Sequence, residues 1–154
     1  MENRLFSNEE EGIFPMTDGD LAQVVAIEEA SFSCPWSQSS FESTLRCPTS
    51  HPFVYRKNGK ILGYAVCSTV FEMAELYDIA VAPECRKAGI GAKLLDFVIE
   101  YCRKEGAETL FLEVRRSNES AKSLYEKKGF VQDSVRKNYY KNPVEDAILM
   151  HLCL

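Results

Sequence analysis

The sequence predicts a single mixed α/β (α+β) domain, in which a sheet of about six to seven strands is flanked by about four helices. Three observations predict this class. A chain of 154 residues with 45% hydrophobic residues has the size of one domain and can fill one core. Asn58-Gly59 lies between two apolar runs and is the strongest short hairpin signal in the chain. Two β runs, ending at Val81 and Val114, enclose a helical segment, so we expect a right-handed crossover between parallel strands.

Helical spacing and turn residues define the N-terminal half. Leu21, Val24 and Val25 recur at helical spacing, and either Thr17 or Asp18 can cap the helix that they form. The expected elements of this half are a flexible acidic tail over 1–11, after which the domain spans 12–154; an edge strand over 13–16; helices over 18–30 and 38–46, the second capped by Ser37; and antiparallel strands over 53–55 and 61–70.

One long amphipathic helix dominates the C-terminal half. Ile90, Leu94 and Val98 lie on one stripe of this helix, and Gly106 stops it. The expected elements of this half are a strand over 71–81, the helix over 90–105, a strand over 109–114, a helix that Asn118 caps and Gly129 ends, and two closing strands over 130–135 and 147–152.

Charge and composition exclude several classes of function. A net charge of −5 and a pI near 5.2 argue against nucleic acid as the main ligand, because binding phosphate backbones needs a basic face. The first residues are polar and lack an apolar core, so we expect neither a secretory signal nor a membrane span. Six cysteines without a C-x-x-C pair predict reduced, mostly buried thiols in a cytoplasmic protein. Neither the cysteines nor His51 and His151 have metal-ligand spacing, so no metal is expected.

The loop from Arg86 to Gly91 is the candidate binding element. It follows an apolar strand and opens the long helix, where unpaired backbone N–H groups meet the positive end of the helix dipole. Arg86 and Lys87 add positive charge, and Gly89 and Gly91 keep side chains out of the way. The pattern therefore predicts a cradle for a pyrophosphate; the alternative is tight packing between a strand and a helix without a ligand.

These residues resemble the coenzyme-A loop, Q/R-x-x-G-x-G/A, of the GNAT N-acetyltransferases, as Arg86-x-x-Gly89-x-Gly91. The similarity runs from about residue 14 to the C-terminus, and the later motifs resemble the ribosomal-protein alanine acetyltransferase (RimI) branch. Those motifs are Leu112-Glu113-Val114-Arg115, Ser117-Asn118, Ala121, Leu124-Tyr125-Glu126, Gly129-Phe130 and Asn138-Tyr139-Tyr140. The resemblance implies acetyl-CoA as co-substrate, bound by Ile79, Ala80, Val81, Arg86, Lys87, Ala88, Gly89, Ile90, Gly91, Ala92 and Asn118. Ala92 stands where many members carry an arginine.

Acyl transfer from a thioester to an amine needs a base for the amine and an acid for the departing thiolate. Glu113 is the candidate base, provided that its apolar neighbours raise its pKa; the alternative is an ordinary strand carboxylate paired with Arg115 or Arg116. Tyr125 follows Asn118 by two helical turns and is the candidate acid; the alternative is a core tyrosine. The resemblance implies the catalytic roles for both residues.

Trp36 and Tyr139 are the candidate acceptor-binding residues, because they fall in the F-x-x-P-W-S and N-Y-Y elements that the family places beside its acceptor. The alternative for Trp36 is a core plug. The implied acceptor is a protein N-terminus, with the N-terminal alanine of a ribosomal protein as the specific expectation, and the enzyme is expected to be a monomer or weak dimer. The stretch 141–144 is shorter than in representatives of the branch, which leaves a small-molecule amine open as the acceptor. A separate alternative is a catalytically silent acyl-CoA-binding regulator, which would keep the loop from Arg86 to Gly91 but need neither Glu113 nor Tyr125.

Overall fold

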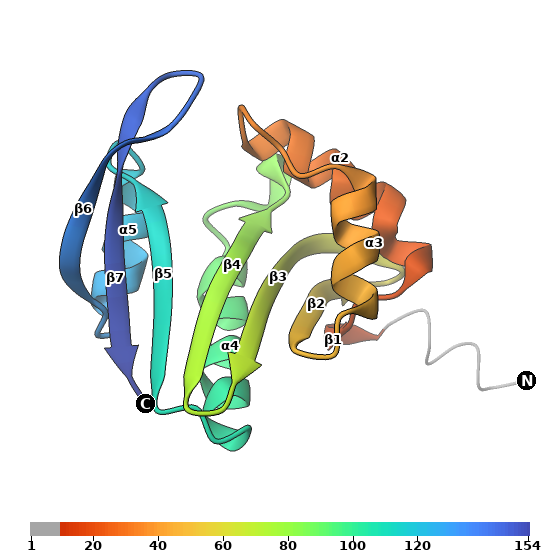
Figure 1. Cartoon of the computed structure of the whole chain (residues 1–154). Coiled ribbons are helices and arrows are strands. Elements are labelled where there is room, and N and C mark those ends of the chain that lie inside the picture. The colour runs from red at the N-terminus through yellow and green to blue at the C-terminus, as the bar shows by residue number, and fades with distance from the viewer. Residues whose placement is uncertain (1–9) are drawn as a thin grey trace, which may run out of the picture.

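A seven-stranded mixed sheet organises the chain (Figure 1). The computed structural model describes residues 10–154. The strand order is β1-β2-β3-β4-β5-β7-β6, and every neighbouring pair is antiparallel except β4 and β5. The elements are β1 (Glu11–Pro15), the 3-10 turn η1 (Asp18–Asp20), α2 (Leu21–Ser31), α3 (Gln38–Arg46), β2 (Ser50–Lys57), β3 (Lys60–Val70), β4 (Met73–Val81), the 3-10 turn η2 (Pro83–Cys85), α4 (Ile90–Lys104), β5 (Thr109–Arg115), α5 (Glu119–Lys127), β6 (Val131–Tyr140) and β7 (Glu145–Cys153).

The predicted fold class is confirmed. Asn58 and Gly59 turn the β2–β3 hairpin with φ of 52° and 80°, the left-handed values that such a tight turn needs. The crossover through α4 joins the parallel strands β4 and β5 as expected. The expected tail overlaps the sheet, because Glu11 begins β1 and pairs with Lys57; residues 1–9 of that tail lie outside the described part of the chain. Strand β6 continues to Tyr140, well past the predicted end at 135.

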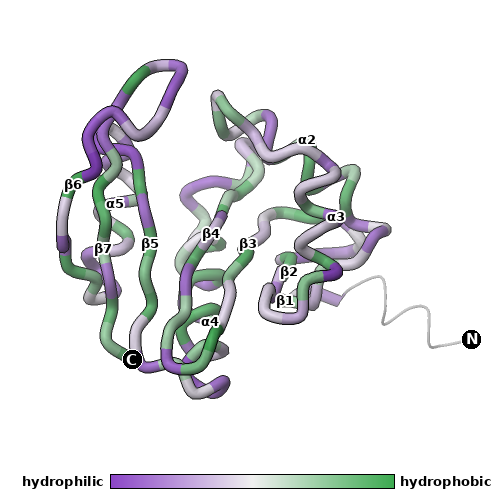
Figure 2. The backbone as a smooth tube through the Cα atoms, viewed as in Figure 1, coloured by the Kyte–Doolittle hydropathy of each residue, from purple (hydrophilic) through white to green (hydrophobic). Residues whose placement is uncertain are grey.

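Helices cover both faces of the sheet and enclose two hydrophobic clusters. Helix α4 packs on β3 and β4 with Leu94, Leu95 and Val98, all fully buried. On the other face, α2 packs on the same strands through Val24, and α3 packs through Phe41. Figure 2 shows hydrophobic residues recurring along β5, β7 and α4.

The parallel strands β4 and β5 diverge part-way along their length. They pair from Met73 with Thr109 to Leu76 with Leu112, and no pairing follows. A bulge at the same level of the β3–β4 ladder, where Val66 faces Asp78, turns β4 away. Strand β4 stays bonded to β3, and β5 stays bonded to β7, so a gap opens in the middle of the sheet (Figure 1).

The cysteines depart from expectation. Cys67 and Cys102 are buried, but Cys34, Cys47 and Cys153 are exposed, so the prediction of mostly buried thiols is wrong. The described cysteines are all free thiols. Among residues 10–154 no helix has the length and apolar character needed to cross a membrane.

Candidate active site

The gap between β4 and β5 leaves one backbone edge of β4 without a strand partner. From Asp78 to Val81, β4 bonds to β3 on one side only. Ala80 is buried in the α2 cluster, whereas the half-buried side chains of Ile79 and Val81 pack toward α4. The predicted cofactor residues of this strand therefore offer backbone N–H and C=O groups to the gap, while their side chains belong to the two cores.

The predicted pyrophosphate loop lies at the end of this open edge. Gly89 precedes α4 with φ of 85°, a left-handed conformation that side chains resist, and an added Cβ there would meet no protein atom. The exposed stretch from Arg86 to Gly89 leads into a fifteen-residue helix, whose first N–H groups have no partner within the helix. These features fit a bound diphosphate.

The residues of this loop divide into exposed and anchored groups. The Arg86 guanidinium donates to Val81 O and to Ser31 Oγ, both at 3.0 Å, so it fixes the loop to β4 and α2. Ile90 is buried, so only its backbone is available to a ligand. The remaining loop positions that the sequence predicted are Lys87 and Ala88, both exposed, and Gly91 and Ala92, both half-buried in the first turn of α4.

Glu113 lies on β5, one residue beyond the last contact with β4. Its Oε2 lies 3.3 Å from Nη1 of Arg136, a residue of β6 that sequence reasoning did not connect to it. The alternative interpretation paired Glu113 with Arg115 or Arg116. Both arginines pair with other carboxylates, Arg115 with Glu145 and Arg116 with Asp146. The ion pair with Arg136 holds Glu113 on the same face of the sheet as the predicted acceptor-binding residues Trp36 and Tyr139.

A second carboxyl group accompanies Glu113 on this face. Burial raises the pKa of Glu75, and the charge of Glu113 raises it further, while Arg136 opposes the shift. Glu75 lies on β4 within its paired part, opposite Phe111 of β5. The two carboxyl groups therefore bracket the point at which the strands separate.

Tyr125 reaches the gap from the opposite side of the sheet. It is a buried residue of α5 whose ring packs on Phe130 with centroids 5.6 Å apart. Burial raises its pKa, and the negative charges of Asp78 and Tyr140 raise it further. The hydroxyl thus keeps its proton at neutral pH, which a proton donor requires. Asn118 caps the same helix, with its side-chain oxygen accepting from Ala121 N–H at 3.2 Å.

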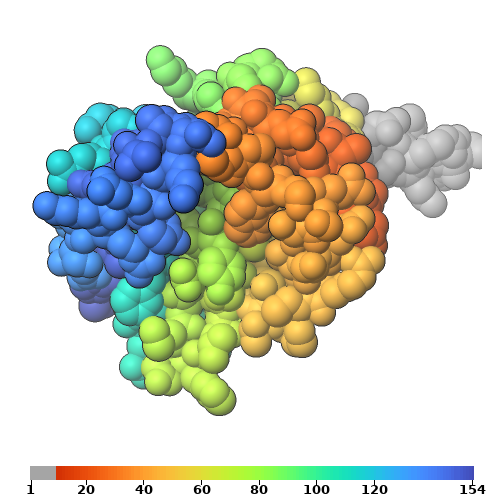
Figure 3. Space-filling view, turned by 45° about the horizontal axis from the view of Figure 1, so that its top comes forward, coloured from red at the N-terminus to blue at the C-terminus, as the bar shows by residue number. Residues whose placement is uncertain are grey.

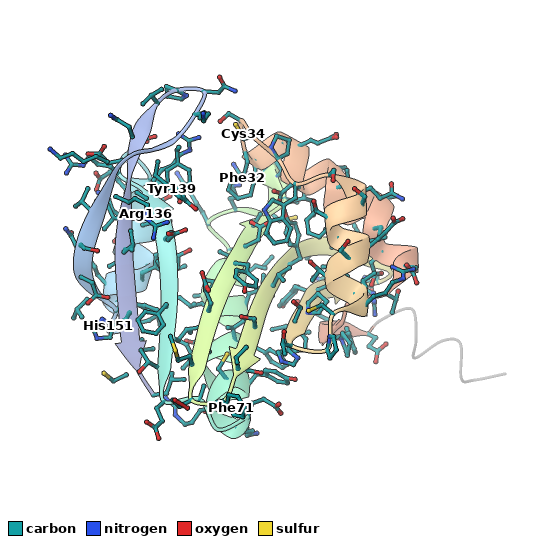
Figure 4. The ribbon with its side chains drawn as sticks, viewed as in Figure 1. Phe32, Cys34, Phe71, Arg136, Tyr139 and His151 are labelled. Carbon is teal, nitrogen blue, oxygen red and sulfur yellow. The ribbon has the colours of Figure 1, made fainter. Side chains whose placement is uncertain are left out.

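The two predicted acceptor residues have different environments. Tyr139 is 42% exposed, and the guanidinium of Arg136 lies 4.8 Å from its ring centroid. Trp36 is half-buried and packs on Phe41, with centroids 5.2 Å apart, which is the contact expected of a core plug. Figure 4 shows Tyr139 and Arg136 on the β6 side of the gap, facing the loop that carries Phe32.

Two connections meet above the gap. The segment between α2 and α3 contributes Ser33 and Cys34, and the β6–β7 connection contributes Lys141 and Asn142. Cys34 Sγ lies 3.7 Å from Lys141 O and 3.6 Å from Asn142 Nδ2, and Arg115 Nη2 donates to Lys141 O at 2.6 Å and to Ser33 Oγ at 3.4 Å. In the space-filling view these two segments touch, and β4 forms the floor of the hollow beneath them (Figure 3).

A buried acidic pair also borders the gap, and sequence reasoning missed it. Asp78 of β4 and Glu28 of α2 are 8% and 2% exposed, respectively. Glu28 accepts hydrogen bonds from the hydroxyl of Tyr64 and from Trp36 N–H. The available signal was an aspartate inside the otherwise apolar end of β4. Within residues 10–154, no group of three or more metal-ligating side chains is arranged to hold a metal.

Comparison with known proteins decides the family. The model of the acetyltransferase (GNAT) family matches residues 21–130. The [ribosomal protein bS18]-alanine N-acetyltransferase of Escherichia coli (strain K12) is 38% identical over 135 residues, which cover 86% of this chain and 90% of that protein. The Haemophilus influenzae protein of the same name is 38% identical over 137 residues, covering 85% and 90%.

The chain belongs to the acetyltransferase (GNAT) family. The crystal structure of the E. coli ribosomal-protein-S18-alanine N-acetyltransferase matches it with a TM-score of 0.87 and 36% identity over 94% of both chains. The resemblance inferred from the motifs is thereby confirmed. The protein is an acetyl-CoA-dependent N-acetyltransferase.

Proposed function

We propose that this acetyltransferase modifies the N-terminal amine of a protein, and that its acceptor is the N-terminal alanine of a ribosomal protein. The relatives named above carry this activity in their names and match nearly the full length of the chain. The observation that carries the proposal is the gap between β4 and β5, which holds Glu113 and Tyr125 on opposite sides of one opening. Such an opening admits a thioester from one face and an amine from the other.

The residues of the chain divide the work of binding. The open backbone edge from Ile79 to Val81 bonds to the arm of the cofactor, and the N–H groups after Gly89 hold its diphosphate. Tyr139 contacts the first residues of the acceptor on the other face. Acetyl-CoA supplies the activated acetyl group when it is bound.

Two residues move the protons. Glu113 accepts a proton from the ammonium group of the acceptor, directly or through water, which leaves a neutral amine that can attack the thioester carbonyl. Tyr125 donates its proton to the departing thiolate. The C–N bond forms as the C–S bond breaks, and the nitrogen then loses a second proton, which restores the hydroxyl of Tyr125 through solvent. The proton that Glu113 received returns to solvent.

An acetyl-CoA turnover assay tests the acceptor class. Peptides that differ only in their first residue, with alanine, serine, methionine or proline, are compared with a polyamine and an aminoglycoside. We expect the peptide that begins with alanine to have the highest kcat/KM. If the small amines exceed all peptides, the proposed acceptor is wrong, although the family chemistry stands.

Paired variants test the proton roles. Glu113→Gln is expected to lower kcat/KM on the order of 10²- to 10⁴-fold at neutral pH, and higher pH should restore it as the acceptor amine deprotonates unaided. Tyr125→Phe is expected to lose about tenfold to a hundredfold at every pH, since raising the pH supplies no other donor. An identical pH response of the two variants would contradict this division of roles.

A further inference from the structure

In the described part of the chain, β5, β7 and β6 present one face without a helical cover (Figure 1). The ladder register places four residues in one row across β4, β5, β7 and β6: Glu75, Phe111, His151 and Val131. The alternate residues of β5, Leu110 and Leu112, point to the opposite face, into the core under α4. The residues of the row are half-buried or exposed, as side chains on an open sheet face are.

This row adjoins the acceptor side of the active site. Glu113 follows Phe111 by two residues on β5, so its side chain lies on the same face, one step closer to the gap. The rings of Phe111 and His151 lie with centroids 6.2 Å apart and form the middle of the row. An extended chain that leaves the gap along this face therefore passes Glu113 first and the row next.

The open face ends at the β3–β4 turn in a group of exposed hydrophobic residues. Val70, Phe71 and Met73 are 50%, 88% and 54% exposed. Val70 and Met73 oppose each other in the ladder, and Met73 lies two residues before Glu75, so both belong to the open face. Figure 4 shows Phe71 at the tip of the turn, and in Figure 3 the turn protrudes at the lower edge of the molecule. Grouped apolar side chains of this kind mark an interaction site.

The backbone of Phe71 supports the same interpretation. Its φ is 56°, a left-handed conformation that Gly and Asn adopt readily and that a bulky side chain resists. The turn is held by the carbonyl of Glu72, which accepts from the N–H groups of Glu108 and Thr109 at 2.7 and 3.3 Å. The turn thus keeps its place without the ring of Phe71, and a partner that packs on this ring accounts for its position.

Charge selects the partner. Glu75 lies within the row, and Asp133 flanks it through a contact of 2.6 Å with Nδ1 of His151. Glu72 and Glu108 are exposed at the turn. The nearby Arg136 is paired with Glu113. An acidic surface that ends in an apolar group fits a polypeptide with basic and apolar side chains, which is the composition of a protein that binds RNA phosphates.

We propose that the face from Glu113 to Phe71, here called the downstream face, binds the segment of the acceptor polypeptide that follows its N-terminal residues. Basic side chains of that segment lie near Glu75 and Asp133, and an apolar side chain packs on Phe71. This proposal rests on the proposed transfer to a protein N-terminus. The four steps of β5 from Glu113 to Thr109 span about 13 Å, so the acceptor reaches Phe71 at about its eighth residue when its first three residues occupy the gap.

Peptide length tests the downstream face. Two peptides begin with the same three residues, the first of them alanine; one ends there, and the other continues to ten residues with alternating lysine and leucine. We expect wild-type kcat/KM to be on the order of tenfold higher for the long peptide, the effect of partly burying one aromatic ring. A third peptide, with glutamate in place of lysine, should lose this gain.

Phe71→Asn removes the ring and retains a residue that suits the left-handed turn, so its Tm should equal or exceed that of wild type. We expect this variant to bring the ratio of long-peptide to short-peptide kcat/KM close to one, with the short-peptide value unchanged. Val144→Asn is the matched control, because Val144 is 67% exposed in the β6–β7 connection, outside the downstream face. Its ratio should match that of wild type.

Three results would overturn the proposal. The first is equal kcat/KM for the short and long peptides in wild type, and the second is a wild-type ratio in Phe71→Asn. The third is a wild-type dimer in sedimentation that Phe71→Asn converts to a monomer, which would assign the face to a second copy of the chain. Turnover of small amines without turnover of any peptide would refute the proposed function itself, whereas the first two results leave that function standing.

Discussion

Replacing Arg115 by methionine should open the acceptor side of the site without disturbing the cofactor side. Arg115 ends β5, and its guanidinium donates to the carbonyl oxygens of Lys141 at 2.6 Å and of Pro143 at 3.1 Å. It also pairs with Glu145 and reaches Ser33 of the opposite segment. One side chain thus ties the β6–β7 connection to β5 and to the segment after α2.

The two carbonyl contacts set the size of the effect. A hydrogen bond from a charged donor contributes about 1.5–3 kcal/mol, and the lower value applies where the carbonyl can regain water. The carbonyls that Arg115 binds belong to an exposed connection, so their loss together is worth about 3 kcal/mol. For a domain of this size, 1 kcal/mol corresponds to about 2–4 °C in Tm, which predicts a decrease of roughly 6–12 °C.

Arg116 provides a matched control on the next residue. Its side chain is 60% exposed, and its Nε lies 3.9 Å from Asp146, so Arg116→Met should change stability by less than about 0.5 kcal/mol. Thermal unfolding, peptide KM and coenzyme A affinity are measured for both variants. We expect Arg115→Met alone to lose stability and raise the peptide KM, with coenzyme A affinity unchanged. Equal Tm and KM values for the two variants would refute the role given to Arg115.

Further variants separate binding from packing. Tyr139→Ala should raise the peptide KM at an unchanged Tm. Trp36→Ala should raise the peptide KM and also lower the Tm, because the Trp36 ring packs on the core. Steady-state kinetics and calorimetry check both variants, and a lower Tm in Tyr139→Ala would place the Tyr139 ring in the core instead. Gly89→Val should abolish measurable coenzyme A binding in calorimetry, since it adds a Cβ at a left-handed residue of the diphosphate loop; wild-type affinity would remove the diphosphate from this loop. The raised pKa of Asp78 means that the folded protein binds this proton more tightly than the unfolded chain does, so this group should lower the Tm progressively from about pH 4 to pH 9. Asp78→Asn should flatten that part of the Tm profile, and equal slopes for the variant and wild type would contradict the raised pKa of Asp78.

Local sequence signals predicted most of the elements because each signal acts over a few residues. Ser37 and Asn118 cap their helices through side-chain oxygens, as their positions before helical patterns indicate. The alternation of apolar residues predicted β5, and with it the crossover from β4 through α4 to β5. The predicted strand ended too early, at residue 135, because a local pattern could not reveal the rest of β6. Its exposed positions from Gln132 to Asn138 are polar and show little apolar alternation. Its length comes from pairing with β7.

The interactions of the active site could not be predicted from local patterns, because they join elements that are distant in the chain. Arg136 reaches Glu113 only through the order β5-β7-β6, in which β7 lies between their strands. Asp78 meets Glu28 because α2 packs across β4, fifty residues later in the chain. Arg115 and Arg116 lie closer to Glu113 in the sequence and were therefore its expected partners, but they bind other carboxylates.

The charges around the gap explain how two substrates can bind at one opening, each on its own face of the sheet. In the binding mode proposed above, the N-terminus of α4 and the basic loop residues at the end of β4 attract the diphosphate of the cofactor. On the acceptor face, the acidic residues Glu75, Glu113, Glu145, Asp78 and Glu28 outnumber Arg136 and Arg115, so an ammonium group should be drawn to the same gap from the other side. Because the two attractions have opposite sign and lie on opposite faces, each substrate is disfavoured in the other's place. The thioester and the amine therefore meet only where the strands separate, between the candidate base and the candidate acid.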